Sequence, residues 1–294
     1  MFHGKHFFGI MAKTIAICNH KGGVGKTTTA INLGTYLAFS GKRTLLIDID
    51  PQGNATSGLG INKHDLKISI YDLLIDESDP KPIIIPTGIN SLSLLPSTIS
   101  LTGAEVELVG AMGREYRLKK ALSSILGDYE FILVDCPPSL GLLTINALAA
   151  ADTVLIPIQC EYYALEGLSQ LVNTVNLVKT NINSSLAIEG VLLTMADYRT
   201  NITNEVIEEA RKFFKEKVYN TVIPRNVKLT EAPGFGKPIA LYDKVSIGAQ
   251  RYKAFADELL GVNKEIQQPL ITEAQPNILS DNDLSKLVAE GEIK

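Results

Sequence analysis

Short apolar runs recur along most of the chain, and longer segments with helical spacing of apolar residues separate them. The runs are rich in Val, Ile and Leu and lie at residues 14–19, 44–50, 91–96, 131–137, 153–159, 189–195 and 220–224. Most are continuously apolar and do not alternate with polar residues, which is typical of strands buried on both faces of a parallel sheet. The pattern therefore predicts strands in the interior of one sheet.

The segments between these runs predict helices at residues 26–40, 116–126, 141–150, 165–180 and 203–217. Gly41 and Gly127 follow the first two, where glycine adopts the left-handed conformation that ends many helices. The last helix is expected to begin at Thr203, with acidic residues early and basic residues late, as the helix dipole favours. The alternation predicts an α/β fold with a doubly wound, mostly parallel sheet flanked by helices.

The two ends of the chain differ from its middle. Residues 1–12 contain a second methionine just before the first predicted strand, and we expect them to be an N-terminal extension. Residues 13–261 are expected to form one domain, with 76–91 as a connection at the sheet edge. Residues 262–294 are polar and proline-interrupted, with three Lys against six Asp and Glu, and we expect a disordered acidic tail with a short helix at 283–289.

Composition and charge narrow the function classes. No apolar stretch reaches the roughly 18 to 20 residues of a membrane span, and the first ten residues do not resemble a signal peptide. Cys18, Cys136 and Cys160 are isolated in sequence, which predicts buried thiols in a reducing cytoplasm instead of a zinc site or disulfide framework. The formal net charge of -4 means that any DNA binding requires a local basic patch.

The stretch NHKGGVGKTTT at residues 19–29 lies between the first predicted strand and helix. Its glycines allow successive N–H groups to converge on phosphate oxygens, and the start of the helix adds to that attraction. Lys26 is placed to reach the β- and γ-phosphates, and the Thr27 hydroxyl to ligate Mg²⁺. The usual first glycine is replaced by His20. We predict a nucleotide site from Lys21, Gly22, Gly23, Val24, Gly25, Lys26, Thr27 and Thr28.

Acidic residues follow two of the predicted strands. Asp48 and Asp50 are two residues apart, so on one strand both would project to the same side. Asp135 ends the apolar run FILVD. Asp48 and Asp135 are predicted to hold Mg²⁺ through water, and Asp50 to orient an attacking water. The alternatives are a solvent-exposed acid pair and, for Asp135, a cap of helix 141–150.

The loop at 19–29, with its second lysine ahead of the glycines, resembles the deviant Walker A box of the ParA/MinD ATPases. The resemblance covers residues 13–260 and is strongest to chromosomal ParA/Soj proteins at 50–60, 136–148, 160–171 and 224–233. It implies that Mg²⁺ and ATP bind in a sandwich homodimer, with Lys21 reaching the partner's phosphates. It also implies that Asp50 is needed for hydrolysis, Pro224 packs on adenine and Asn226 hydrogen-bonds it. His20 departs from the glutamine more usual before this lysine.

The resemblance also implies a function, an ATP-dependent switch for chromosome or plasmid segregation at the nucleoid. The ATP-bound dimer would bind DNA without sequence preference through Arg199 and Lys228, and a ParB-type partner would stimulate slow hydrolysis. Close relatives often carry arginine at Lys228, and lysine lacks the bidentate fork. Arg225 and Arg251 are further candidates.

Two other functions stay open at this level. A membrane-positioning ATPase like MinD would end in a basic amphipathic helix, whereas this tail is acidic, so we expect no membrane binding. A metabolic P-loop enzyme, such as a dethiobiotin synthetase or amidoligase relative, would carry an acid or base outside the nucleotide site, and the sequence suggests none.

Overall fold

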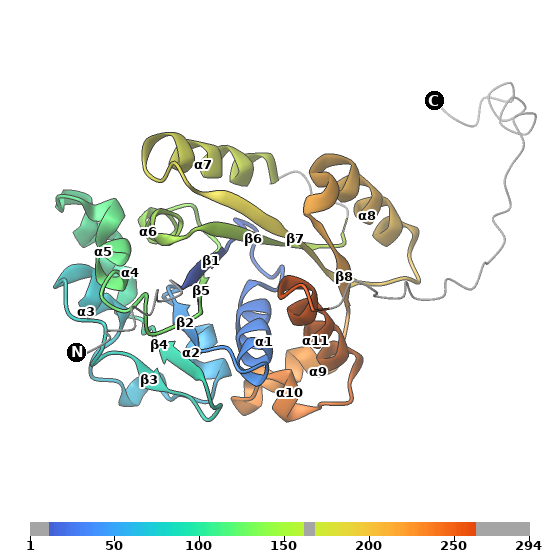
Figure 1. Cartoon of the computed structure of the whole chain (residues 1–294), viewed down its shortest axis with the longest axis horizontal. Helices are drawn as coiled ribbons and strands as arrows, with labels where there is room; N and C mark the ends of the chain where they lie inside the picture. Colours follow the sequence, from blue (N-terminus) through green and yellow to red (C-terminus); the bar gives the residue numbers. More distant parts are fainter. Residues whose placement is uncertain (1–11, 162–167, 263–294) are drawn as a thin grey trace, which may run out of the picture. The chain divides into compact units, whose positions relative to one another are not determined.

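The computed structural model of the protein describes residues 12–161 and 168–262. Its centre is one sheet with the strand order β3-β4-β2-β5-β1-β6-β7-β8 (Figure 1). All neighbouring strands pair in parallel except β3 and β4, so the predicted mostly parallel, doubly wound sheet is confirmed. The strands are β1 (Lys13–Ile17), β2 (Thr44–Asp48), β3 (Ile85–Pro86), β4 (Leu92–Leu95), β5 (Phe131–Asp135), β6 (Thr153–Gln159), β7 (Ala187–Ala196) and β8 (Val218–Pro224).

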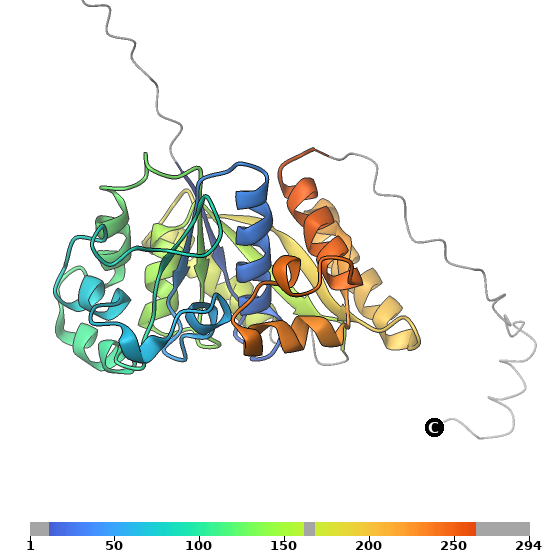
Figure 2. The ribbon, with the colours of Figure 1, turned by 90° about the horizontal axis from the view of Figure 1, so that it is seen from below.

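Helices cover both faces of the sheet. One face packs against α3 (Ile70–Ile75), α4 (Leu101–Glu107), α5 (Arg117–Leu122), α6 (Leu142–Ala150), α7 (Leu168–Asn181) and α8 (Asn201–Phe214). The other packs against α1 (Lys26–Phe39), α2 (Asn54–Gly58), α9 (Val227–Glu231), α10 (Ile239–Tyr242) and α11 (Ile247–Leu259). Figure 2 shows α1 and α11 side by side on that face, where the Thr29 and Tyr252 hydroxyls are 3.1 Å apart.

Alternate strand residues enter two separate apolar clusters. In β2, Leu45 and Ile47 pack on the α6 side, whereas Leu46 packs on the α1 side. All three are fully buried because each face of the sheet is covered. This two-sided burial explains why the strands read as continuous apolar runs.

The predicted strands are all present, with ends within two residues of those expected. The sequence pattern missed β3, which lies in the connection at 76–91 and pairs at the edge of the sheet. Pro86 is tolerated there because an edge strand need not donate every N–H group.

The predicted helices are present, but several ends were wrong. Gly41 has φ of +78°, as expected for a helix end. Gly127 does not have a positive φ, and α5 ends before it at Leu122. Helix α8 begins after Thr200 instead of at Thr203, and its first turn carries no acid. Its last turn does carry basic residues. The prediction missed α11 and the short helices α2, α3, α4, α9 and α10.

The described residues contain no helix long and apolar enough to cross a membrane. The expected extension at 1–12 and tail at 262–294, with its helix at 283–289, lie outside the described residues apart from Ala12 and Val262. Ala12 is buried, and its N–H donates to the Leu126 carbonyl at 3.0 Å.

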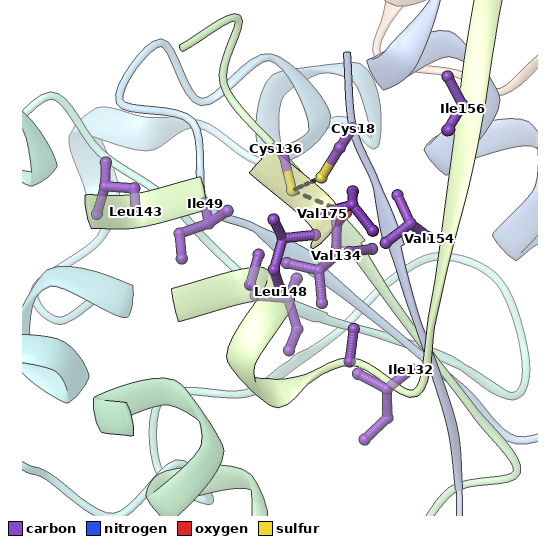
Figure 3. Packing of buried hydrophobic residues seen from close by; sticks show 14 of the residues in the cluster. Cys18, Ile49, Ile132, Val134, Cys136, Leu143, Leu148, Val154, Ile156 and Val175 are labelled. Atoms are coloured by element: carbon purple, nitrogen blue, oxygen red, sulfur yellow. Dashed lines mark hydrogen bonds between the residues drawn. The ribbon is translucent and has the colours of Figure 1, made fainter. Parts of the chain in front are cut away.

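The cysteines are buried, as predicted. Cys18 and Cys136 directly follow the neighbouring strands β1 and β5, and their sulfur atoms lie 2.8 Å apart (Figure 3). Burial raises the pKa of the Cys136 thiol well above its usual value. A thiol in this state is a poor nucleophile, so we assign the pair a packing role.

Candidate functional site

The loop between β1 and α1 contains the predicted phosphate-binding residues in one continuous turn. Gly23 and Gly25 have φ of +74° and +88°, a conformation that favours glycine. Gly25 is the N-cap of α1, so the predicted residues Lys21, Gly22, Gly23, Val24, Gly25, Lys26, Thr27 and Thr28 span the loop and the first helical turn. The free N–H groups at this end favour an anion.

Two side chains outside the glycine motif fix the shape of the loop. The Asn19 amide donates to the Pro157 carbonyl at 2.8 Å and accepts from the Lys21 N–H at 3.1 Å. The Thr194 hydroxyl lies 2.9 Å from the Val24 carbonyl. Sequence reasoning missed both roles, since Pro157 and Thr194 lie on distant strands and carry no local signal.

The two loop lysines lie in different environments. Lys26 is only 6% exposed, and its ammonium donates to the Lys21 carbonyl at 3.0 Å. Burial lowers the pKa of Lys26, while nearby Asp135 acts in the opposite direction. Lys21 is partly exposed, and none of the hydrogen bonds or ion pairs between described residues involves its ammonium. Lys26 is thus fixed within the loop, whereas Lys21 is available to reach outward.

Asp135 ends β5 directly opposite Asp48 at the end of β2. It is fully buried, and neither carboxylate oxygen has a hydrogen-bond partner among the described residues. Burial, followed by the charge of Asp48, raises the pKa of Asp135 well above its usual value. The Thr27 hydroxyl lies nearby and partly offsets this rise in the pKa of Asp135, although it does not form a hydrogen bond with either carboxylate oxygen. The cap of α6 is Gly141, so the capping alternative for Asp135 is excluded.

Asp48 is equally buried but fully hydrogen-bonded. One oxygen accepts from the Thr56 N–H and hydroxyl, both at 2.7 Å, and the other accepts from the Asp50 N–H at 3.3 Å. Burial raises the pKa of Asp48 to about 6, and the Thr56 bonds hold it below a still higher value. Its predicted role as a metal ligand through water therefore competes with a structural role.

Asp50 does not lie on the strand with Asp48, which corrects the expectation from the sequence. Strand β2 ends at Asp48, and Asp50 occupies the following turn, where it is 7% exposed. Its carboxylate accepts from the Gln52 N–H at 2.9 Å. The alternative of a solvent-exposed acid pair is wrong, because both carboxylates are buried beside the loop.

These residues fit a magnesium-bound triphosphate. The unpaired Asp135 carboxylate lies beside the Thr27 hydroxyl and near the Lys26 ammonium. Hard oxygen donors of this kind suit Mg²⁺, and a buried carboxylate without partners is costly unless a cation or donor compensates it. The arrangement can therefore bind a cation and an anionic group side by side.

The turn predicted to contact a base follows β8, on the same edge of the sheet. Pro224 lies opposite Ala196 of β7, two residues beyond the loop-supporting Thr194. The side-chain oxygen of Asn226 is buried and has no hydrogen-bond partner among the described residues. A ligand amino group is a suitable partner for it.

The predicted DNA-binding residues are exposed but paired with acids. Arg199, after β7, bonds Asp197 through Nε at 2.8 Å, and this lowers the pKa of Asp197 to about 2. Lys228, on α9, bonds Glu231 at 3.0 Å. Arg225 is also paired, with Glu161 at 3.0 Å. Both predicted residues follow parallel strands at the edge that carries the loop, but no hydrogen bond or ion pair among described residues joins them.

Comparison with known proteins shows the family to which the chain belongs. A family model described as an AAA domain matches residues 12–188. The sporulation initiation inhibitor protein Soj of Bacillus subtilis is 61% identical over 249 residues, covering 85% of this chain and 98% of that protein. The chromosome partitioning protein ParA of Myxococcus xanthus is 54% identical over 257 residues, covering 87% and 91%.

A solved structure of similar fold is cobyrinic acid a,c-diamide synthase from Mycobacterium smegmatis with bound ADP and magnesium. It is 38% identical, with a TM-score of 0.75, and the match covers 85% of this chain and 94% of that one. The phosphate loop, the neighbouring Asp48 and Asp135 and these similarities all indicate the same family. The chain belongs to the ParA/Soj family of chromosome-partitioning P-loop ATPases.

Proposed function

We propose that this protein is an ATP-dependent switch that dimerises on Mg·ATP, binds DNA without sequence preference and leaves it after hydrolysis. The observation that carries the proposal is the buried, unpaired Asp135 carboxylate beside the glycine loop. A magnesium–triphosphate relieves that unpaired charge, so the nucleotide becomes part of the folded edge of the sheet. We assign the ATPase domain to residues 13–261, with 1–12 as an extension and 262–294 as a tail.

The loop residues Lys21 to Thr28 bind the phosphates, and the turn at Pro224 and Asn226 binds the adenine. The Lys26 ammonium exchanges the Lys21 carbonyl for phosphate oxygens, which stabilises its charge. Asp135 and Thr27 hold Mg²⁺, with Asp48 behind them. The metal, when bound, neutralises phosphate charge.

Asp50 orients the attacking water. Its carboxylate lies in the turn after β2 and keeps one oxygen free of hydrogen bonds to other described residues. The proposed hydrolysis is slow because this chain supplies positioning without a strong base. Lys21 of the second copy completes each site, and a ParB-type partner with a basic segment accelerates turnover.

The bound dimer brings together two sets of the exposed basic residues Arg199 and Lys228, so that DNA meets a local basic patch although each chain has a net charge of -4. Contacts of this kind go to phosphates, so binding is salt-dependent and insensitive to sequence. We therefore expect the ATP-bound protein at the nucleoid.

Sedimentation analysis tests the proposal with ADP, with Mg·ATP and for Asp50→Ala with Mg·ATP, each with and without duplex DNA. We expect a monomer with ADP and a long-lived, DNA-bound dimer for Asp50→Ala with ATP. An Asp50→Ala variant that binds ATP but stays monomeric and off DNA would refute the switch.

Two results would instead favour other functions. Turnover stimulated by a small amidation substrate and not by DNA would favour an enzyme like the structurally similar diamide synthase. ATP-dependent binding to anionic vesicles and not to DNA would favour a membrane-positioning ATPase of the MinD kind.

A further inference from the structure

A closed ring of hydrogen bonds lies beneath the turn that carries Asp50. The Thr56 hydroxyl donates to Asp48 at 2.7 Å and accepts from the Ser97 N–H at 3.0 Å. The Ser97 hydroxyl donates to the Asp50 carbonyl at 2.7 Å, and the Asp50 N–H returns to Asp48 at 3.3 Å. Asp48, Thr56 and Ser97 are all fully buried.

The donors and acceptors of this ring are consistent. A threonine hydroxyl has one hydrogen and two lone pairs, so it can donate to Asp48 and still accept from Ser97. Asp48 can act only as an acceptor while it is ionised, so the Thr56 hydroxyl must donate to it. The other directions are fixed by the backbone, because the N–H groups of Ser97 and Asp50 donate and the Asp50 carbonyl accepts. Inside a low-dielectric environment such a chain is stronger than its separate bonds.

The ring fixes the backbone of Asp50, which the hydrogen bonds of the sheet do not hold. Asp50 lies beyond the end of β2, so no ladder bond fixes its peptide groups. Its N–H is held by Asp48, and its carbonyl is held by Ser97 and by the Gly53 N–H at 2.9 Å. Fixing both peptide groups sets the direction in which the Asp50 carboxylate leaves the backbone.

Gly53 shows how closely Ser97 approaches this turn. It has φ of +60°, and a Cβ added to it would lie 3.0 Å from the Ser97 carbonyl oxygen. The β4–α4 connection is therefore packed directly on the turn after β2. The position of this connection is therefore coupled to the turn that carries Asp50 by the contact between Ser97 and Gly53 and by the hydrogen bond from Ser97 to Asp50.

We propose that Ser97 and Thr56 are positioning residues for the Asp50 carboxylate in ATP hydrolysis. The inference rests on the proposed function, because it assumes that Asp50 orients the attacking water. Neither hydroxyl touches the phosphate loop through a hydrogen bond among the described residues, so their effect is on turnover and not on nucleotide affinity.

Steady-state ATPase kinetics of Ser97→Ala and Thr56→Val test the inference, because each change deletes one hydroxyl of the ring. Loss of orientation at a reacting group is expected to lower kcat by about tenfold, with KM for ATP within about twofold of the wild type. Thr56→Ser keeps the hydroxyl and is expected to retain near-normal kcat.

Thr44→Val is the matched control. Thr44 is equally buried and lies in β2 at the end opposite Asp48, where its hydroxyl donates to the Lys42 carbonyl at 3.0 Å. It is expected to lower the melting temperature as much as Ser97→Ala without changing kcat. Equal kcat for Ser97→Ala, Thr56→Val and Thr44→Val would overturn the inference, as would a change confined to KM. A wild-type protein without ATPase activity would overturn the proposed function itself, and the inference with it.

Discussion

The phosphate-loop edge and the basic surface around Arg199 and Lys228 differ in whether their charged side chains have partners. At the loop edge, Asp135 is fully buried and neither of its oxygens has a partner among the described residues. At the basic surface, Arg199 and Lys228 are exposed and each is paired with an acid of its own segment. The first region contains a carboxylate without a hydrogen-bond partner, which a ligand can supply, whereas the two cations of the second region already have acidic partners.

This difference separates two kinds of binding. A ligand at the loop edge adds a missing partner, so binding should be tight and should stabilise the folded protein. A polyanion at the basic surface must replace Asp197 and Glu231, so each contact gains little. In the proposed function, dimerisation on ATP doubles these weak contacts, and we therefore expect DNA binding to depend on the nucleotide.

The largest effect is expected from deleting the unpaired carboxylate. Asp135→Ala should lower ATP turnover by about 100-fold or more, because a catalytic metal contributes several kcal/mol. Asp152→Ala is the matched control, since Asp152 precedes β6 at the opposite edge and accepts from the Thr14 N–H at 2.8 Å. Turnover is measured by phosphate release with excess Mg²⁺. Equal turnover in the two variants would show that Asp135 has no role in the nucleotide site.

The second effect concerns stability without ligand. Burial raises the pKa of Asp135, so its neutral form stabilises the native state, and that stability is lost as pH rises through the raised pKa. Asp135→Asn should therefore melt at a higher temperature than the wild type at pH 8. The gap should shrink as the pH is lowered, because the wild-type carboxyl then takes up its proton. A gap independent of pH would show that Asp135 does not titrate in this window.

A smaller effect is expected from the basic surface. Arg199→Ala and Lys228→Ala should each weaken ATP-dependent DNA binding equally for all sequences. Each should reduce the slope of log affinity against log salt by about 1 for every DNA phosphate that the variant dimer no longer neutralises. Fluorescence anisotropy over a salt series measures this, with exposed Lys119→Ala on α5 as the control. Slopes unchanged from the wild type would place the DNA elsewhere.

The smallest effect should go in the opposite direction. Asp197→Asn removes the acid that pairs with Arg199 and should raise DNA affinity by about threefold, as expected for release of an exposed ion pair. The same anisotropy assay detects it. Weaker binding by Asp197→Asn would mean that the pair orients Arg199 toward DNA instead of competing with it.

Local patterns were enough to predict much of this molecule. The two-sided burial of β2 and β5 is visible in their apolar runs, and the loop at 19–29 is contiguous, so both could be identified from sequence. Asp50 was assigned to the wrong backbone setting, because nothing local marks the end of β2 at Asp48.

The remaining features depend on contacts between distant residues. Thr194 supports Val24 from 170 positions away, and Ser97 reaches Asp50 across 47. Such pairs follow from the order of strands in the sheet, which a single sequence does not specify. The pairing of Arg199 with Asp197 was within reach of sequence reasoning, since the two residues are neighbours in one turn and carry opposite charges.

In the proposed dimer, Lys21 completes the nucleotide site of the second copy, so dimerisation should depend on this side chain. Sedimentation velocity with Mg·ATP should compare Asp50→Ala, Asp50→Ala with Lys21→Ala, and Asp50→Ala with Lys119→Ala, after equal ATP binding has been verified for all three. We predict dimers for the first and third proteins and a monomer for the one that lacks Lys21. A full dimer in the absence of the Lys21 side chain would show that Lys21 is not needed to complete the partner's site.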